Sequence, residues 1–480
     1  MPKVTVYIPS YNYGRYLDKS IQSVLKQSIQ DWDLIIIDDG STDNTQEILA
    51  KYRNHSKIRI VEQENRGLNV TNNIAVRLAN GRYIMRLDAD DYVDENILLI
   101  LSNVLDTRPD VGLVYPDYYL IDDQDEILEV VRRKKIDDEV ELLDLPAHGA
   151  CTMIRKEYLI EVGGYSEEFR CQDGYDLWLK MIASYRPYNV NIPLFYYRQH
   201  GHNMTSQQGK ILGTRAAIKR RFVESEIQGS VPRVLGLVSA VGRSVYPQSH
   251  PFVQLAGKPL IWYTLNEVLK SKLLDRVVVS SEDDAVLEYA SKFPGILPLK
   301  RSEELTKSTT RMEDVAQEVL IGLKASSGYE PDAVCTLSIN TPLRRADHID
   351  RAIDTMIIFG TDSVVSVQEE LGLFYRHLRL GLSPVGNSGG ALRLEREALY
   401  KANGAIHLTR IHTIQGGRLD AQRVGHITML PEESIKTNSE FELWLAEKIF
   451  QEWLLDNDEL ADKGRGGPKE SDSGISGFSA

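Results

Sequence analysis

Short apolar runs that end in polar or acidic loops set the strongest limit on how the first part of this chain can fold. They occupy residues 4–8, 34–37 and 83–87, and helical patterns such as residues 17–27 separate them. Runs of this length are typical of strands that are buried on both faces, and their alternation with helices favours a mostly parallel sheet between helices. The sequence therefore predicts an α/β domain whose functional loops lie at the carboxyl ends of its strands.

The same pattern restarts after a basic helical stretch at residues 218–222. Further strands are predicted at residues 234–238, 276–280 and 333–337, with a helix at residues 260–269. A chain of 480 residues is also too long for one ordinary core. We therefore expect a first domain at 1–225, a linker at 226–231, a second α/β domain at 232–455 and a disordered tail at 456–480.

Composition narrows the class of protein. The formal net charge of −13 argues against a nucleic-acid binder, which needs a basic face. No run of about 18 apolar residues predicts a membrane span, and no secretory signal is recognised at the N-terminus. The three cysteines have no metal-ligand spacing, which favours reduced thiols. We expect a cytoplasmic protein, with peripheral association at the inner face of the membrane left open.

Acidic residues follow two of the predicted strands. Asp38 and Asp39 end one, and Asp88, Asp90 and Asp91 end another. Carboxylates gathered at one sheet edge repel each other, and a hard divalent cation with bound diphosphate oxygens would neutralise them. The alternative is a helix cap with a solvated acidic first turn, because 69 acidic residues make a chance Asp-x-Asp match common.

A set of motifs in fixed order favours the first interpretation. The motifs are Pro9-Ser10-Tyr11-Asn12, Ile37-Asp38-Asp39-Gly40-Ser41, Asn65-Arg66-Gly67, Arg86-Leu87-Asp88-Ala89-Asp90-Asp91, Gln172-Asp173-Gly174-Tyr175-Asp176 and Tyr197-Arg198-Gln199-His200. Together they resemble glycosyltransferase family 2, whose members are inverting enzymes with the GT-A fold. The resemblance spans nearly all of residues 1–205 and implies a nucleotide-sugar donor.

The resemblance also implies a role for each matching residue. Nucleoside contacts are implied for Pro9, Tyr11, Asp39, Asn65, Gly67 and Asp88. Asp90 resembles the ligand of a divalent cation, Mn²⁺ or Mg²⁺, and His200 is either a second ligand or a surface or phosphate-facing histidine. Asp173 resembles the general base that takes the proton from the acceptor hydroxyl. Asp176 has an alternative interpretation as a helix-capping acid.

The second domain resembles the cytidylyltransferases that make CMP-activated sugar acids. Matching segments are Gly257-Lys258-Pro259-Leu260, Arg301 with Glu304-Leu305, Thr341-Pro342-Leu343-Arg344 and Asn403-Gly404-Ala405-Ile406. Positions where that family carries phosphate-binding cations hold Val241, Val245 and His250-Pro251, with Arg243 at a glycine position. Ser338 replaces the base-reading glutamine, and Lys436 and Asn438 replace the late acidic pair. These changes predict a domain without nucleotidyl-transfer activity.

The combined interpretation has two nucleotide-binding α/β domains with mostly parallel sheets. It predicts a metal-dependent, inverting hexosyltransferase that moves a sugar from a nucleoside-diphosphate donor, with UDP the first expectation, to a glycan or lipid-linked acceptor in surface polysaccharide synthesis. The C-terminal domain would serve for dimerisation or binding. A bifunctional enzyme that also activates a sugar acid with CTP, and a non-catalytic binding protein, stay open as alternatives.

Overall fold

A computed structural model of the chain contains two compact units. It describes residues 1–133, 149–169, 172–200, 208–227, 231–242, 247–307, 309–370, 372, 374–379, 381–385, 399–419 and 422–453. The first unit comprises Met1–Gly229 and Glu370–Leu399, and the second comprises Ser230–Glu369 and Tyr400–Ala480. The predicted tail at residues 456–480 lies outside the described residues.

The first unit is built on a nine-stranded mixed sheet. Its strand order is β3-β2-β1-β4-β8-β6-β9-β5, and β7 pairs with β6. The strands are β1 (Val4–Ser10), β2 (Trp32–Asp38), β3 (Ile58–Glu62), β4 (Tyr83–Arg86), β5 (Tyr92–Val93), β6 (Val111–Ile121), β7 (Ile127–Val131), β8 (Met153–Arg155) and β9 (Arg186–Arg198). The four strands at the β3 edge are parallel, and β8 is antiparallel to its neighbours β4 and β6.

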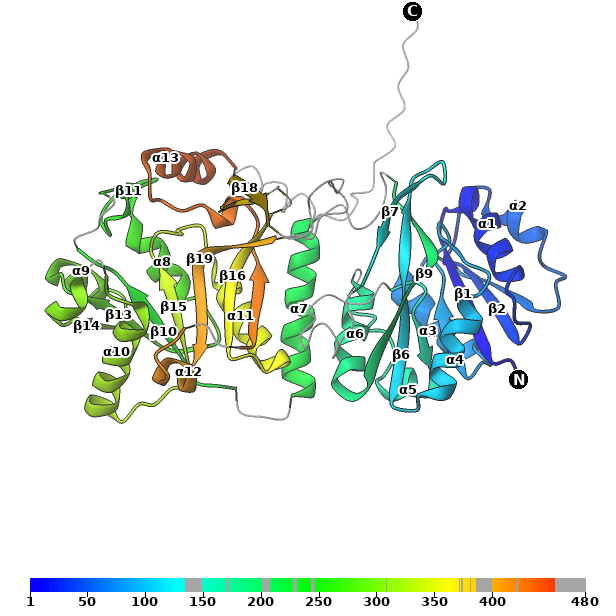
Figure 1. Ribbon diagram of the computed structural model, residues 1–480, viewed down its shortest axis with the longest axis horizontal. Helices are drawn as coiled ribbons and strands as arrows, with labels where there is room; N and C mark the ends of the chain where they lie inside the picture. The colour runs from blue at the N-terminus through cyan, green and yellow to red at the C-terminus, as the bar shows by residue number, and fades with distance from the viewer. Residues whose placement is uncertain are drawn as a thin grey trace, which may run out of the picture. The chain divides into compact units, whose positions relative to one another are not determined.

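Most helices of this unit pack against the sheet, because the chain must return to the same edge between parallel strands, whereas the last helix packs against the helix before it. The helices are α1 (Gly14–Leu25), α2 (Thr45–Ala50), α3 (Leu68–Leu78), α4 (Ile97–Thr107), α5 (Lys156–Glu161), α6 (Asp173–Ser184) and α7 (Gln208–Glu226) (Figure 1). The buried positions of α1 include Leu17, Ile21 and Val24, which recur every three to four residues and join the core formed by β1 and β2.

The second unit has a seven-stranded sheet in the order β14-β13-β10-β15-β19-β16-β20. These strands are β10 (Val234–Ser239), β13 (Leu274–Ser281), β14 (Ile296–Lys300), β15 (Ala333–Ser338), β16 (Ser363–Glu370), β19 (Leu399–Arg410) and β20 (Val424–Thr428). The second unit also contains the short hairpin of β11 (Gln254–Leu255) and β12 (Lys258–Pro259), whereas the hairpin of β17 (Tyr375–Leu378) and β18 (Gly381–Pro384) lies in the segment that belongs to the first unit.

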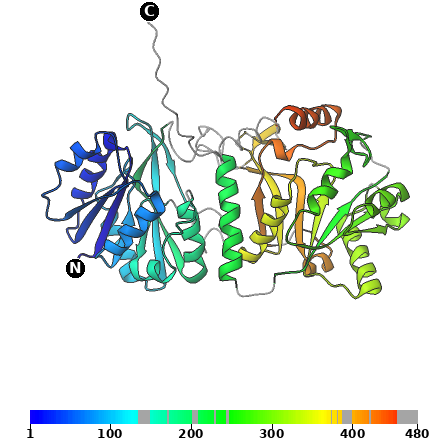
Figure 2. The same cartoon turned by 180° about the vertical axis from the view of Figure 1, so that it is seen from behind.

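The helices of the second unit alternate with its strands, as they do in the first. They are α8 (Leu260–Val268), α9 (Asp284–Ser291), α10 (Met312–Ser327), α11 (Ala346–Phe359), α12 (Ile411–Gln415) and α13 (Glu440–Lys448), and Figure 2 shows them from the opposite side. The buried residues Ile261, Leu265 and Ile353 pack from two of these helices into the core that contains Val234 and Val279.

The two sheets share a strand arrangement that the sequence did not display. When the strands of each main sheet are numbered in chain order, both sheets begin at one edge with the order 3-2-1-4. These four strands are parallel, and an antiparallel strand lies beside the fourth. The prediction of two α/β domains with mostly parallel sheets is confirmed. Every strand and helix predicted above overlaps an observed one, with ends that differ by a few residues for most of them.

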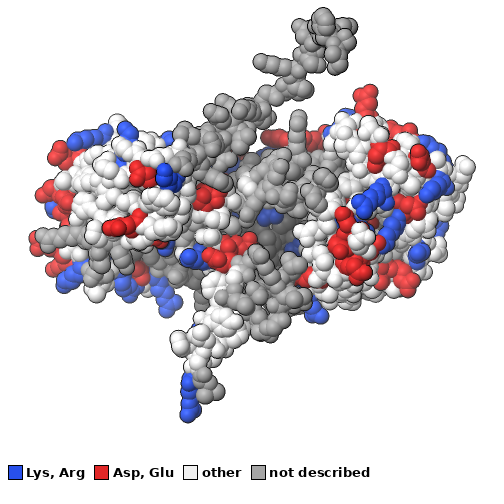
Figure 3. Space-filling model, turned by 90° about the horizontal axis from the view of Figure 1, so that it is seen from above, with Lys and Arg blue, Asp and Glu red and all other residues white. Residues whose placement is uncertain are grey.

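The described surface carries both signs of charge. Lysine and arginine side chains are interspersed with aspartate and glutamate on the face shown in Figure 3. Among the helices that the structure describes, none has both the length and the apolar character needed to cross a membrane.

Candidate active site

The candidate site lies at the carboxyl ends of β1, β2 and β4, where the acidic loops begin. Strand pairing aligns Ser10 at the end of β1 with Asp38 at the end of β2. On the other side of β1, Arg86 at the end of β4 pairs with Tyr7. The loops that follow these three adjacent strands therefore meet at one edge of the sheet, which is where open parallel sheets bind ligands.

Asp39 is buried and organises the loop that precedes α3. Its Oδ1 accepts hydrogen bonds from the Arg66 backbone N–H at 2.8 Å and from Gln63 Nε2 at 2.7 Å, and its Oδ2 accepts one from the Gly67 N–H at 2.9 Å. Asn65 and Gly67 are exposed on the loop that these bonds hold. The resemblance implied that Asp39 contacts the base, and the structure adds that its carboxylate fixes the backbone beside that contact.

Gly40 follows Asp39 and explains why this turn can form. Its φ is +82°, and a methyl group there would lie 2.9 Å from the backbone N of Asn65. Only glycine combines this left-handed conformation with such a close approach at little cost. The two loops that carry Asp39 and Asn65 are thereby packed backbone to backbone.

The loop after β1 presents an exposed aromatic ring. Pro9 lies in β1 opposite Ile37, and Tyr11 follows the strand with 46% of its surface exposed. Asn12 adopts a φ of 59°, donates its N–H to Ser41 Oγ at 2.9 Å and accepts the Thr42 N–H at 2.7 Å. These bonds fix the loop against the one that carries Asp38 and Asp39, and they leave the Tyr11 ring accessible.

Asp88 is held by an arginine. Arg86 is nearly buried, and its Nε lies 2.8 Å from Asp88 Oδ1 while its Nη2 donates to Oδ2 at 3.3 Å. A two-point pair of this kind fixes the plane of a carboxylate as well as its charge. The guanidinium also offsets part of the repulsion among Asp88, Asp90 and Asp91.

Asp90 and His200 lie together, as the implied metal site requires. His200 Nε2 is 3.0 Å from Asp90 Oδ2, and the imidazole ring is stacked on Tyr16. The described residues contain no group of three His, Cys, Asp or Glu side chains arranged to hold a metal ion. A pair of protein ligands nevertheless fits Mg²⁺ or Mn²⁺ in this setting, because such ions keep several waters and bind through one or two carboxylates together with substrate phosphates.

Burial and neighbouring charge raise the pKa of two further groups at this edge, Asp91 and Tyr13. Burial, together with the charges of Asp90 and Asp88, raises the pKa of Asp91 well above its ordinary value. Burial and the same two carboxylates also raise the pKa of the Tyr13 hydroxyl. A concentration of negative charge sufficient to affect both groups is a favourable environment for a cation.

Arg198, at the end of β9, holds the segment that contains Asp90 and Asp91 in place through hydrogen bonds. Its Nε donates to the Asp90 carbonyl at 3.0 Å and its backbone N–H donates to Asp91 Oδ1 at 2.9 Å. The guanidinium also pairs with Asp125 and lies over the Tyr16 ring. The sequence placed Arg198 in a family motif without assigning it a role, and only the long-range strand pairing discloses one.

Gly149 and Gly174 lie close together and allow the start of α6 to pack near Arg86. A methyl group at Gly174 would lie 3.2 Å from Gly149 Cα, and a methyl group at Gly149 would lie 2.9 Å from Arg86 Nη2. Asp173 is the first residue of α6, so its backbone is adjacent to this pair of glycines. The side chain of Asp173 lies outside what the structure describes. The backbone nevertheless places the predicted base on an element packed against the arginine that binds Asp88.

The alternative role for Asp176 as a helix cap is wrong. The residue that precedes α6 is Gln172, with a φ of 61°, and no side chain caps the helix there. Asp176 lies inside the first turns, where its Oδ2 accepts the Ser166 N–H at 3.3 Å and pairs with Lys180 Nζ at 2.7 Å. Asp176 therefore anchors the loop that precedes α6 to the helix, because Ser166 belongs to that loop.

The corresponding edge of the second unit combines neutral polar groups with arginines, and Arg301 Nη2 donates to Ser239 Oγ at the end of β10 at 2.7 Å. Asn340 Nδ2 and Ser249 Oγ both lie within hydrogen-bonding distance of Asn438 Oδ1, at 3.5 and 3.2 Å. Ser338 ends β15 and its carbonyl accepts from Arg344, whose complete burial lowers the pKa of its guanidinium to about 10. Positions 243–246 of the former phosphate loop lie outside the described residues.

Two family models match separate parts of this chain. The model of the family described as "Glycosyl transferase family 2" matches residues 5–163, and that described as "Cytidylyltransferase" matches residues 249–444. A chondroitin synthase of Escherichia coli is 30% identical over 211 residues, covering 42% of this chain and 30% of its own. A hyaluronan synthase of Pasteurella multocida is 31% identical over 212 residues, covering 42% of this chain and 21% of its own.

The chain thus spans less than a third of the length of these curated relatives. Among solved structures, that of Staphylococcus aureus TarS 1-349 is 18% identical with a TM-score of 0.39, covering 47% of this chain and 67% of its own.

Proposed function

We propose that this chain, which joins a glycosyl transferase family 2 domain to a cytidylyltransferase domain, transfers a sugar from a nucleoside-diphosphate donor to an acceptor hydroxyl with inversion at the anomeric carbon. The observation that carries the proposal is the gathering of Asp39, Asp88 and Asp90 at adjacent strand ends beside the start of α6. The acceptor is a glycan or a lipid-linked glycan in polysaccharide synthesis. The support for this proposal is that two of the relatives are named as a chondroitin synthase and a hyaluronan synthase.

The donor nucleoside would bind between the loops after β1, β2 and β3. Tyr11 offers an exposed ring for the base, and Asp39 holds the Asn65–Gly67 backbone in place next to it. Asp88, oriented by Arg86, would accept hydrogen bonds from the ribose hydroxyls. UDP is the first nucleotide to test.

Asp90 and His200 are the residues that would hold the divalent cation. When bound, the cation neutralises charge on the departing nucleoside diphosphate. Arg198 keeps the segment that carries Asp90 in position through its bond to the Asp90 carbonyl.

Asp173 would act as the general base. It takes the proton from the acceptor hydroxyl as that oxygen attacks the anomeric carbon and the bond to the diphosphate breaks. One displacement with one base inverts the configuration at that carbon. Packing of α6 onto Gly149 supports this role because it places the backbone at the start of α6 next to the segment that approaches Arg86, the partner of Asp88.

The second domain would be non-catalytic and would hold the protein as a homodimer. Val241 and His250 stand where a triphosphate needs cations, and the side chains within hydrogen-bonding distance of Asn438 Oδ1, from Ser249 and Asn340, are neutral. The apolar core from β10 to β20 is nevertheless complete. A sheet that retains its core without phosphate-binding charge fits a packing or assembly role, and two-fold dimers are the most common soluble assembly.

Donor hydrolysis tests the catalytic proposal directly. The full chain is incubated with Mn²⁺ and a panel of UDP-, GDP-, dTDP- and CMP-linked sugars, and release of the nucleotide is measured. We expect release from one nucleoside-diphosphate class, and strong loss with Asp88→Asn, which keeps the size of the side chain. The matched control is Asp110→Asn, at an exposed ion pair with Arg108 and with Arg186, which lies at the opposite end of β9 from Arg198. Equal release by Asp88→Asn, or release by no donor, would contradict the proposal.

A further inference from the structure

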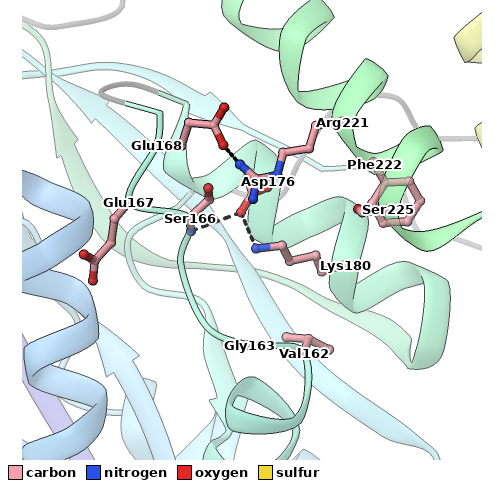
Figure 4. Close-up of a pocket in the computed structure, with 10 residues that line it drawn as sticks. All are labelled: Val162, Gly163, Ser166, Glu167, Glu168, Asp176, Lys180, Arg221, Phe222 and Ser225. Carbon is pink, nitrogen blue, oxygen red and sulfur yellow. Dashed lines mark hydrogen bonds and ion pairs between the residues drawn. The ribbon is translucent and has the colours of Figure 1, made fainter.

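A polar cavity lies against α6 in the first unit. Its volume is about 380 Å³, within the range of small-molecule sites. The lining residues come from the segment between α5 and α6, from α6 itself and from α7, and they are Val162, Gly163, Ser166, Glu167, Glu168, Asp176, Lys180, Arg221, Phe222 and Ser225 (Figure 4).

Two ion pairs contribute to the polar lining of the cavity, together with two serines and Glu167. Asp176, with 8% of its side chain exposed, pairs with Lys180 at 2.7 Å, and Arg221 pairs with Glu168 across from it (Figure 4). Phe222 adds apolar surface. The cavity therefore presents both hydrogen-bond donors and acceptors, and each charge in these two pairs already has a counter-charge.

The loop that forms one wall is held in place by α3. Asn69 Nδ2 donates to the carbonyls of Ser166 and Phe169, both at 2.6 Å. Asn73 donates to the Tyr165 carbonyl at 2.9 Å and accepts the Tyr165 N–H at 3.0 Å. A cavity whose wall is held by several hydrogen bonds to side-chain amides needs less ordering when a ligand binds.

Two residues of the cavity lining lie on the same face of α6 as the proposed base. Residues 173, 176 and 180 are spaced i, i+3 and i+7 on α6, so these positions share one face of the helix. With a rise of about 1.5 Å per residue, Asp176 and Lys180 lie about 4.5 and 10 Å further along the axis than Asp173.

We infer that this cavity binds a neutral sugar ring of the acceptor, next to the ring whose hydroxyl is attacked. The inference rests on the proposed function. Sugar hydroxyls both donate and accept hydrogen bonds, and the two ion pairs offer both kinds of partner, while Phe222 meets the apolar face of a ring. An anionic ligand would have to displace Asp176 from Lys180 or Glu168 from Arg221, so a neutral ring is favoured over a uronic acid.

Binding of simple glycosides to the full chain tests this assignment. The probes are the methyl glycosides of glucose, galactose, N-acetylglucosamine, N-acetylgalactosamine and glucuronic acid, observed by saturation-transfer NMR with UDP and Mn²⁺ present. We expect a neutral glycoside to bind and the glucuronide to bind more weakly. Arg221→Gln and Lys180→Gln should each weaken binding about tenfold or more, the loss expected for one charge-assisted hydrogen bond.

Arg220→Gln is the matched control. Arg220 is adjacent on α7, pairs with Glu224 and does not line the cavity, so glycoside binding should be unchanged. Unchanged binding in Arg221→Gln and Lys180→Gln, tighter binding of the glucuronide, or no binding by any glycoside would overturn the inference. Donor hydrolysis measured on the same samples separates this failure from failure of the proposed function, because the cavity lining includes none of the residues assigned to the donor site.

Discussion

Alanine substitutions at Gly149 and Gly174, the two glycines packed between Arg86 and α6, should affect catalysis differently. In Gly174→Ala the added methyl would lie 3.2 Å from Gly149 Cα, whereas carbon atoms pack at about 3.5–4.0 Å, so the start of α6 must shift by about 0.3–0.8 Å. Alanine also favours a helix over glycine by up to about 1 kcal/mol, which offsets part of an overpacking cost of about 1–3 kcal/mol. The fold should therefore persist while the base is displaced.

A displacement of about 1 Å can cost about 10²-fold in rate, or about 2.7 kcal/mol of activation free energy. We expect Gly174→Ala to lower kcat by about 10- to 100-fold and to leave donor affinity within about twofold. In Gly149→Ala the methyl lies 2.9 Å from Arg86 Nη2. This change should displace the guanidinium that orients Asp88, so it should weaken donor binding as well as lower kcat.

The assay combines steady-state transfer at saturating donor, calorimetry of UDP binding and a thermal melt for each variant. Gly213→Ala in α7 is the control, because no atom lies within 4 Å of its added methyl, and it should retain full activity. The reasoning is refuted if Gly174→Ala keeps the wild-type kcat, or if it loses donor binding to the same extent as Gly149→Ala.

Three further predictions concern the metal, the base and the second domain. Chelation should abolish transfer, and Asp90→Asn should reduce turnover strongly with an unchanged melting temperature; full activity in excess chelator would remove the metal from the mechanism. Asp173→Asn should lower kcat by about 10²- to 10⁴-fold while UDP binding persists, and near-normal turnover would assign the base elsewhere. The second domain should release no pyrophosphate from CTP, and light scattering should give the mass of a dimer; a monomeric full-length chain would exclude the assembly role.

The sequence determined the architecture because local patterns specify it. Apolar runs at β1, β2 and β4, and polar loops after them, are short-range signals that predict strands and the edge at which ligands bind. The order of the acidic motifs was sufficient to predict that Asp39, Asp88 and Asp90 belong to one nucleotide-sugar site. Equally, the absence of cations at Val241 and His250 could be read directly from the chain.

Tertiary structure alone decided what each carboxylate contacts. Asp39 binds backbone N–H groups 27 and 28 residues away, and Arg198 reaches the Asp90 carbonyl across 108 residues. The role of Asp176 changed from a cap to an anchor for the same reason, since its partner Ser166 belongs to the preceding loop. Local patterns reveal which residues an element contains, but hydrogen bonds and close packing between distant segments depend on how the sheet brings those segments together.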